Sequence, residues 1–334
     1  MNGAEAPRPT TGAGRGRAAP ARAVDAPSPV DAGPTGPSAS PGPVAVDAEA
    51  VDAVIDWFAE AGRDLPWRHE DVSAWAILVS EVMLQQTPVV RVLPRWREWM
   101  RRWPAPADLA DAPTAEVLRC WDRLGYPRRA LRLQECARAI VREHGGRVPR
   151  GQEALRALPG IGEYTAAAVT AFAHHGRAVV VDTNIRRVLA RSVLGRALPD
   201  RSYSAAERAL ATRSLPAARE RSVAWNQSVM ELGALVCTAR SPRCAQCPLA
   251  GNGCAWFAAG RPAPEPDTRR RQAFEGTDRQ MRGLIMALLR REGAASQDQL
   301  MALDREDPDR VRRGVRTLVA DGLAVQDGAG LSLP

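Results

Sequence analysis

The stretch Leu158–Val169, LPGIGEYTAAAV, carries two glycines one residue apart between two apolar segments. The spacing of the apolar residues predicts one helix over 152–158 and a second over 164–173. A glycine turn between two helices exposes backbone amides at the start of the second, where a phosphate group can bind. Such a contact positions a polyanion without reading its sequence. The alternative is an ordinary helix–helix turn.

Helical spacing of apolar residues continues on both sides of this turn, which predicts an all-α domain. Residues 1–48 contain few large apolar side chains, a composition typical of a disordered tail. A proline-rich linker follows the domain, and the last segment reads as three helices and a hairpin, which resembles a winged helix; a small packing or partner-binding domain is the alternative. The expected divisions are 1–48, 49–259, 260–276 and 277–334.

The charge balance favours a polyanionic partner. The chain has 334 residues and a formal net charge of +8, and all 46 of its Lys and Arg residues are arginine. Arginine suits forked contacts to phosphates and bases, although a bias in genome composition would also explain the absence of lysine. We find no apolar run of membrane-spanning length, and we therefore expect a soluble, cytoplasmic protein.

Four cysteines form a compact cluster with the spacing C-x6-C-x2-C-x6-C. Zinc sites of four cysteines usually come as two close pairs, whereas this cluster has only one. The spacing therefore favours an iron–sulfur cluster over zinc. Cys120 and Cys136 stand alone in helical segments, where we expect buried apolar residues. The four candidate ligands are Cys237, Cys244, Cys247 and Cys254.

The order of the motifs resembles a known superfamily. The glycine hairpin, the stretch VVVDTNIRRVL and the four-cysteine loop together resemble the helix-hairpin-helix base-excision DNA glycosylases that carry an iron–sulfur cluster. The stretches SEVMLQQT (80–87) and NQSVMELGALVC (226–237) are similar to the adenine-specific MutY family. The resemblance implies a 4Fe-4S cluster and a two-lobed fold. A six-helix barrel lobe would span about 76–184, and an iron–sulfur lobe about 49–75 and 185–259.

The sequence departs from the family pattern in three places. The last gap of the cysteine cluster has six residues where the family usually has five. One extra residue stands between LPWR and Trp75. The family's usual C-terminal domain, which resembles a nucleotide-pyrophosphohydrolase and helps to recognise 8-oxoguanine, is not apparent.

Hydrolysis without strand cleavage is the expected reaction. Relatives that also cut the strand use a lysine in the second helix of the hairpin, and Tyr164 takes that place here. Because the chain has no lysine, efficient Schiff-base chemistry is not expected. Hydrolysis needs an acid to protonate the leaving base, and the helical neighbours of Glu81 are mostly apolar, which favours its protonated form.

Asp182 follows an apolar run and precedes a helix, so the pattern alone predicts a helix N-cap. The resemblance implies instead that Asp182 stabilises the oxocarbenium-like sugar, with Tyr164 assisting at the same centre.

The resemblance also implies which residues contact the two bases. Gln86, Thr87 and Tyr126 would contact the orphaned guanine or 8-oxoguanine, with helix-end packing as the alternative for Tyr126. The hairpin glycines Gly160 and Gly162 would contact the DNA backbone. The pocket for the flipped adenine would include Trp67, Arg68, Leu84 and Glu231, with pairing to a nearby arginine as the alternative for Glu231. Helical spacing assigns Trp96, Trp99 and Trp103 to the core.

The sequence therefore predicts a monofunctional adenine glycosylase acting on adenine mispaired with 8-oxoguanine or guanine. Its expected partner is double-stranded DNA containing such mispairs, with no membrane and no second subunit. Two alternatives are a mismatch thymine glycosylase of the same superfamily and a non-catalytic iron–sulfur DNA-binding protein.

Overall fold

The computed structural model describes residues 45–264, 274–328 and 330–334. The expected tail at 1–48 and linker at 260–276 therefore lie mostly outside the described residues. Among the described residues, no helix is both long and apolar enough to cross a membrane. The elements up to the linker are α1 Ala48–Ala61, η1 Pro66–Arg68, α2 Ala74–Leu84, α3 Val89–Arg102, α4 Pro106–Asp111, α5 Thr114–Trp121, η2 Asp122–Leu124, α6 Arg128–His144, α7 Gln152–Ala157, α8 Glu163–Phe172, α9 Thr183–Ser192, α10 Ala205–Arg213, α11 Arg219–Leu235, η3 Cys244–Gln246 and α12 Ala255–Ala258.

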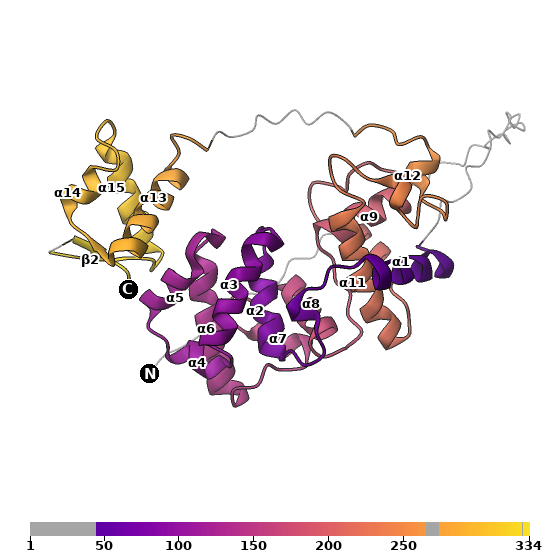
Figure 1. Cartoon of the computed structure of the whole chain (residues 1–334), viewed down its shortest axis with the longest axis horizontal. Helices are drawn as coiled ribbons and strands as arrows, with labels where there is room; N and C mark the ends of the chain where they lie inside the picture. The colour runs from indigo at the N-terminus through magenta and orange to yellow at the C-terminus, as the bar shows by residue number, and fades with distance from the viewer. Residues whose placement is uncertain (1–44, 265–273, 329) are drawn as a thin grey trace, which may run out of the picture. The chain divides into compact units, whose positions relative to one another are not determined.

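One hydrophobic core surrounds α2, which packs against α3, α6 and α8 (Figure 1). The residues Trp75–Met83 of α2 are all buried, so this helix is enclosed on every face. Trp96, Trp99 and Trp103 lie in the same core, which confirms their expected structural role. The indole N–H groups of Trp96 and Trp99 donate to the carbonyl oxygens of Ala76 and Cys120, so burial leaves neither donor unpaired.

A second core lies among α1, α9, α10 and α11. Helix α8 contributes to both cores: Ala166 and Val169 pack in the first, and Ala167, Ala168 and Ala171 pack in the second. The small side chains of α8 allow helices from both lobes to approach it closely. The first core also contains Leu65, Trp67 and Trp75, although the expected division placed the whole of 49–75 in the other lobe.

The glycine hairpin joins α7 to α8. Gly160 has φ +76°, and a Cβ atom placed there would lie 2.8 Å from Cβ of Arg132. A side chain at this position would thus be strained and would also meet α6, so the turn requires glycine. Gly162 is the N-cap residue of α8. The two helices of the hairpin lie within one residue of their expected bounds at each end.

The C-terminal unit, described by itself, has three helices and a small sheet. Its elements are α13 Asp278–Glu292, β1 Ala294–Ala295, α14 Gln297–Met301, α15 Pro308–Ala320, β2 Val325–Asp327 and β3 Gly330–Ser332. The predicted helices and hairpin are present, and β1 adds an unpredicted third strand, which gives an antiparallel sheet in the order β1-β3-β2. This order of elements is that of a winged helix.

Candidate active site

Helix α2 carries Glu81 into the first core. Ser73 caps the start of α2 by accepting a hydrogen bond from the amide of Ala76, and the helix then runs through buried positions to Leu84. Only 6% of Glu81 is exposed. Burial and, to a smaller extent, the charge of Asp182 raise the pKa of Glu81 from 4.5 to about 7, although the hydrogen bond from Tyr164 and the charge of Arg68 oppose the rise. About half of the Glu81 carboxyl groups therefore carry a proton at neutral pH.

Tyr164 lies in the first turn of α8 and faces Glu81. Its hydroxyl donates a hydrogen bond to Oε2 of Glu81, with an O···O distance of 3.0 Å. Burial and the charges of the two carboxylates, Glu81 and Asp182, raise the pKa of Tyr164 well above its usual value. Because the phenol remains protonated at neutral pH, it donates a hydrogen bond to Glu81 and does not act as a general base.

Asp182 is the N-cap of α9, and its carboxylate also lies near Glu81 and Tyr164. Its Oδ1 accepts a hydrogen bond from the amide of Ile185 at 2.7 Å, and its Oδ2 accepts one from Nδ2 of Asn184 at 2.7 Å. Burial raises the pKa of Asp182, while these hydrogen bonds oppose the rise. The cap expected from the pattern is thus present, and the same carboxylate is close enough to Glu81 and Tyr164 to shift the pKa of each.

Glu231 of α11 is buried against two arginines. Its Oε1 accepts a hydrogen bond from Nε of Arg63 at 2.6 Å, and its Oε2 accepts bonds from Nη2 of Arg63 and of Arg68 at 2.8 Å and 2.9 Å. Burial alone would raise the pKa of Glu231, but the two arginines outweigh it and lower this pKa to about 2. The expected alternative, pairing with an arginine, is therefore the arrangement seen in the structure.

The other three residues expected in the adenine pocket, Trp67, Arg68 and Leu84, lie near Glu231 or at the end of α2. Trp67 is 6% exposed, and its ring packs edge-on against Trp96 at a centroid distance of 5.6 Å. Leu84 ends α2 three residues after Glu81 and is partly buried against the first core. The sequence did not single out Arg63. Its partner Glu231 lies 168 residues away, and no local pattern signals so distant a pair.

The residues expected to contact the orphaned base lie on two neighbouring turns. Gln86 is exposed with φ +55°, and Tyr126 is 45% exposed with φ +47°. Thr87, in contrast, is buried, and its hydroxyl donates to the carbonyl oxygen of Leu124 at 3.0 Å. The ring of Tyr126 is half-exposed, and it also lies 5.6 Å from the guanidinium of Arg129.

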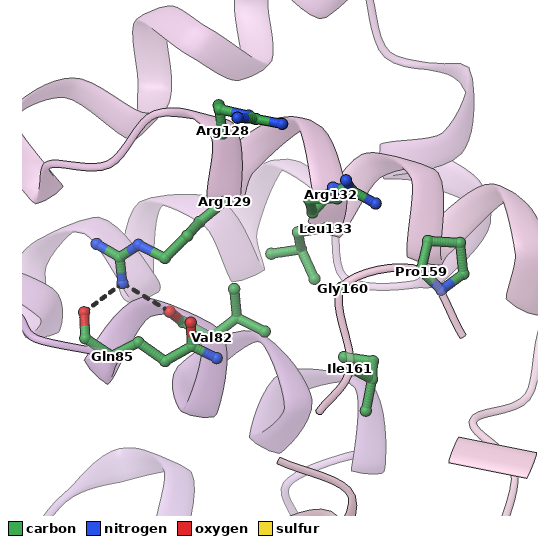
Figure 2. A pocket seen from close by; sticks show the side chains of 9 residues that line it. All are labelled: Val82, Gln85, Arg128, Arg129, Arg132, Leu133, Pro159, Gly160 and Ile161. Atoms are coloured by element: carbon green, nitrogen blue, oxygen red, sulfur yellow. Dashed lines mark hydrogen bonds between the residues drawn. The ribbon is translucent and has the colours of Figure 1, made fainter. Parts of the chain in front are cut away.

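A cavity of about 120 Å³ lies beside these turns, between the end of α2, helix α6 and the hairpin (Figure 2). It is lined by Val82 and Gln85 and by Gly160 and Ile161 of the hairpin. None of Glu81, Tyr164 and Asp182 lines it. The cavity therefore belongs to the surface around the hairpin and is separate from the carboxylate centre.

The four cysteines of the expected cluster lie near enough for the charges of three of them to act on Cys247, although no three such side chains in the described part of the chain are arranged to hold a metal ion. Burial, together with the charges of Cys237, Cys244 and Cys254, raises the pKa of Cys247 to about 12. A cationic centre such as iron binds cysteines as thiolates and would overcome this rise in pKa. Nη1 of Arg191 also donates to Sγ of Cys237 at 3.3 Å. The donor set thus fits an iron–sulfur cluster.

Comparison with known families agrees with this geometry. Residues 79–213 match the HhH-GPD superfamily of base excision DNA repair proteins, and residues 237–252 match the iron–sulfur binding domain of endonuclease III. The chain is 48% identical over 274 residues to the adenine DNA glycosylase of Mycobacterium tuberculosis (strain H37Rv), covering 82% of this chain and 89% of the relative. The chain belongs to the adenine DNA glycosylase (MutY) family.

Two further relatives agree with this placement. The chain is 48% identical over 278 residues to the adenine DNA glycosylase of Mycolicibacterium smegmatis, covering 83% of this chain and 93% of that protein. The solved structure of a thermostable thymine-DNA glycosylase aligns with a TM-score of 0.57 and 30% identity, covering 63% of this chain and 95% of that one. The expected mostly helical glycosylase fold is confirmed, as is membership of the adenine-specific family.

The family match also confirms the iron–sulfur cofactor. The matched iron–sulfur segment begins at Cys237 and ends at residue 252, two residues before Cys254. The longer last gap of this chain lies at that point. The iron–sulfur interpretation of the spacing, rather than zinc, therefore holds.

Proposed function

We propose that this adenine DNA glycosylase family member hydrolyses the N-glycosidic bond of adenine mispaired with 8-oxoguanine or guanine, without strand cleavage. The observation that carries the proposal is the buried carboxyl of Glu81, whose pKa is raised to about 7 and whose Oε2 accepts a hydrogen bond from Tyr164. A carboxylic acid with a pKa near 7 is protonated in a large fraction of molecules at neutral pH and can supply the proton that an adenine leaving group needs.

Glu81 transfers its proton to a ring nitrogen of the extruded adenine as the glycosidic bond breaks. The sugar then becomes a positively charged, oxocarbenium-like species. The carboxylates of Asp182 and of the deprotonated Glu81 stabilise this positive charge, and water completes hydrolysis. The hydroxyl of Tyr164, which already donates to Glu81, stabilises the new carboxylate and so favours proton release.

The flipped adenine is bounded by Trp67, Arg68 and Leu84. Both oxygens of Glu231 already accept hydrogen bonds from arginines, so we assign Glu231 the role of holding Arg68 in place. A carboxylate oxygen can accept more than one hydrogen bond, so contact with the exocyclic amine of adenine remains compatible with this pairing. The exposed side chains of Gln86 and Tyr126 hold the base left behind, and the buried Thr87 supports the turn between them.

The expectation that there is no lyase activity rests on side-chain chemistry. The chain has no lysine, and Tyr164 stands in the second helix of the hairpin where lyase relatives have one. A Schiff base requires an amine, and the phenol of Tyr164 has no nitrogen with which to form one. The enzyme would thus release adenine and leave an intact abasic strand.

The DNA backbone would contact the hairpin and the cysteine loop. The amide groups at Gly160 and Gly162 precede the start of α8, where phosphates are favoured. When bound, the 4Fe-4S cluster holds the cysteine loop in one conformation, and that loop carries the exposed Arg240 and Arg243. We expect one copy of the chain to act on each mispair.

Single-turnover excision on three duplexes tests the proposal. The duplexes contain adenine opposite 8-oxoguanine, adenine opposite guanine and thymine opposite guanine. Release of adenine from the first two, with no strand break before alkali treatment, supports the proposed function. Release of thymine but not adenine would replace it with the mismatch thymine reaction, and release of no base would favour a non-catalytic DNA-binding role.

A further inference from the structure

Arg129 of α6 bonds to the end of α2. Its Nη1 donates to the carbonyl oxygens of Val82, Met83 and Gln85 at 2.8, 3.1 and 2.6 Å, and Figure 2 shows its side chain directed at Val82 and Gln85. These carbonyls lie at or just after the last turn of α2, where helix geometry leaves carbonyl groups without intrahelical partners. Arg129 therefore caps the helix that carries Glu81 and fixes the direction in which the chain leaves it.

The same guanidinium also bonds to the turn before α6. Its Nη2 donates to Oγ1 of Thr87, to the carbonyl oxygen of Leu124 and to that of Gly125, each at 3.0 Å. Thr87 donates in turn to the carbonyl of Leu124 at 3.0 Å. One side chain thus joins two segments that are about 40 residues apart in the sequence.

Both joined segments hold a residue in an unfavourable backbone conformation. Gln86 has φ +55° and Tyr126 has φ +47°, values that residues with a side chain adopt only when their surroundings impose them. Each lies next to a group that Arg129 contacts. The guanidinium also lies 5.6 Å from the ring of Tyr126 and 5.1 Å from that of Trp121. Arg129 is therefore placed to impose both conformations.

The contacts of Arg129 suit an internal linker better than a DNA ligand. The six acceptors of its Nη atoms are five backbone carbonyls and one hydroxyl. Burial lowers the pKa of Arg129 to about 10. A lysine has no planar fork and cannot bond to both segments in this way.

We infer that Arg129 is a positioning residue that holds Gln86 and Tyr126 in the geometry needed to read the base opposite the target adenine. This inference rests on the proposed function, because it assigns the opposite-base contacts to those two exposed side chains. Thr87, whose side chain is buried, links the two turns. Loss of Arg129 should affect discrimination between opposite bases more than the chemistry at Glu81.

The test compares Arg129→Lys with wild type in single-turnover excision of adenine opposite 8-oxoguanine and opposite guanine. We expect the ratio of the two rates to fall by about tenfold in the variant, which corresponds to roughly 1.4 kcal/mol of lost discrimination. Thr87→Val, which removes only the linking hydroxyl, should lower the ratio in the same direction. Arg142→Gln is the matched control, because Arg142 lies on the same helix and is exposed, and its ratio should stay within about twofold of wild type.

Each remaining outcome has a defined meaning. A wild type that releases no adenine refutes the proposed function. If the wild type is active, three results overturn the inference: equal rates opposite 8-oxoguanine and guanine in the wild type, equal losses on both duplexes in Arg129→Lys, or no change in either variant. Thermal unfolding and iron–sulfur absorbance of each variant show whether it is folded. If Arg129→Lys does not fold, the ratio measured with Thr87→Val decides.

Discussion

Glu81 combines a buried position with a polar partner. Its carboxyl lies on a helix enclosed on every face, yet it accepts a hydrogen bond from Tyr164 and lies near the charge of Asp182. The hydrogen bond favours the ionised form, and burial favours the protonated form. Because burial is the larger effect, the Glu81 carboxyl keeps its proton up to about neutral pH. Once it has lost that proton, the hydroxyl of Tyr164 stabilises the carboxylate by donating a hydrogen bond.

This balance makes a prediction about stability. The folded-state pKa of Glu81, about 7, lies above its ordinary value of 4.5, so the folded protein keeps this proton in a pH range where the unfolded chain has lost it. The free energy of unfolding should therefore decrease as the pH rises from about 4.5 to 7. Glu81→Gln has no carboxyl to titrate at this position. Between pH 4.5 and 7 its free energy of unfolding should therefore rise relative to that of wild type by on the order of 2–3 kcal/mol.

Urea unfolding of both proteins at pH 5 and pH 8 measures this difference. A constant gap between wild type and variant at the two pH values would show that the Glu81 carboxyl is not held protonated by the fold.

The sequence predicts Glu81, Tyr164 and Asp182 because each stands in a short motif with its own local signal. It does not predict Arg63 or Arg129. The acceptor of Arg63 is a carboxylate 168 residues away, and three of the carbonyls that Arg129 binds are more than 40 residues away, so these contacts leave no pattern near either arginine. The role of Asp182 as a helix cap follows from the residues alone, whereas its place beside Glu81 required the family resemblance or the folded structure.

The hairpin shows which glycine of a motif carries the constraint. Gly160 has a positive φ and no room for a Cβ beside Arg132, whereas Gly162 has φ −88° and open space around it. Both glycines stand out equally in the sequence, and only the fold distinguishes them.

Alanine at these two positions should therefore have unequal effects. Gly160→Ala should lower the free energy of unfolding by about 1–3 kcal/mol and weaken DNA binding, because the turn must shift. Gly162→Ala should cost less than about 1 kcal/mol, since only the cap preference changes. Thermal unfolding and binding to an undamaged duplex measure both effects, and equal losses in the two variants would refute this account of the turn.

The small strand β1 marks the limit of prediction at the scale of elements. The helices α13 and α15 and the hairpin of β2 and β3 follow from local periodicity and turn residues. Two alanines, Ala294 and Ala295, have no strand preference and pair only because β3 lies beside them. Long elements with a clear period are thus predictable, and short elements defined by distant pairing are not.

At the scale of the whole molecule, helix α8 connects the two hydrophobic cores, and the cysteine loop is the expected site of the cofactor. Helix α8 packs in both hydrophobic cores and carries Tyr164 between the helices of Glu81 and Asp182. The sequence predicts the two lobes through the family resemblance. It cannot place Leu65, Trp67 and Trp75 in the first core, because that assignment depends on how the chain crosses between lobes.

The cysteine loop leads to a prediction about cofactor content. The purified protein should be brown and contain iron, and Cys247→Ser should lose visible absorbance and have a lower melting temperature, because the remaining thiolates no longer enclose a complete cluster. Cys136→Ser is the control. Cys136 is buried in the first core, away from the cysteine loop, so this variant should keep the visible absorbance of the cluster. A colourless protein that binds zinc would contradict the assignment.

The pH dependence of adenine excision tests most directly whether Glu81 supplies the proton. The single-turnover rate of wild type on adenine opposite 8-oxoguanine, measured from pH 6 to 9, should fall as the pH rises through about 7, because Glu81 loses the proton that the leaving base requires. Glu81→Gln should be slower by about a hundredfold or more and should lack this descending limb. A wild-type rate that stays flat or increases over this range, or a Glu81→Gln variant as fast as wild type, would contradict the account.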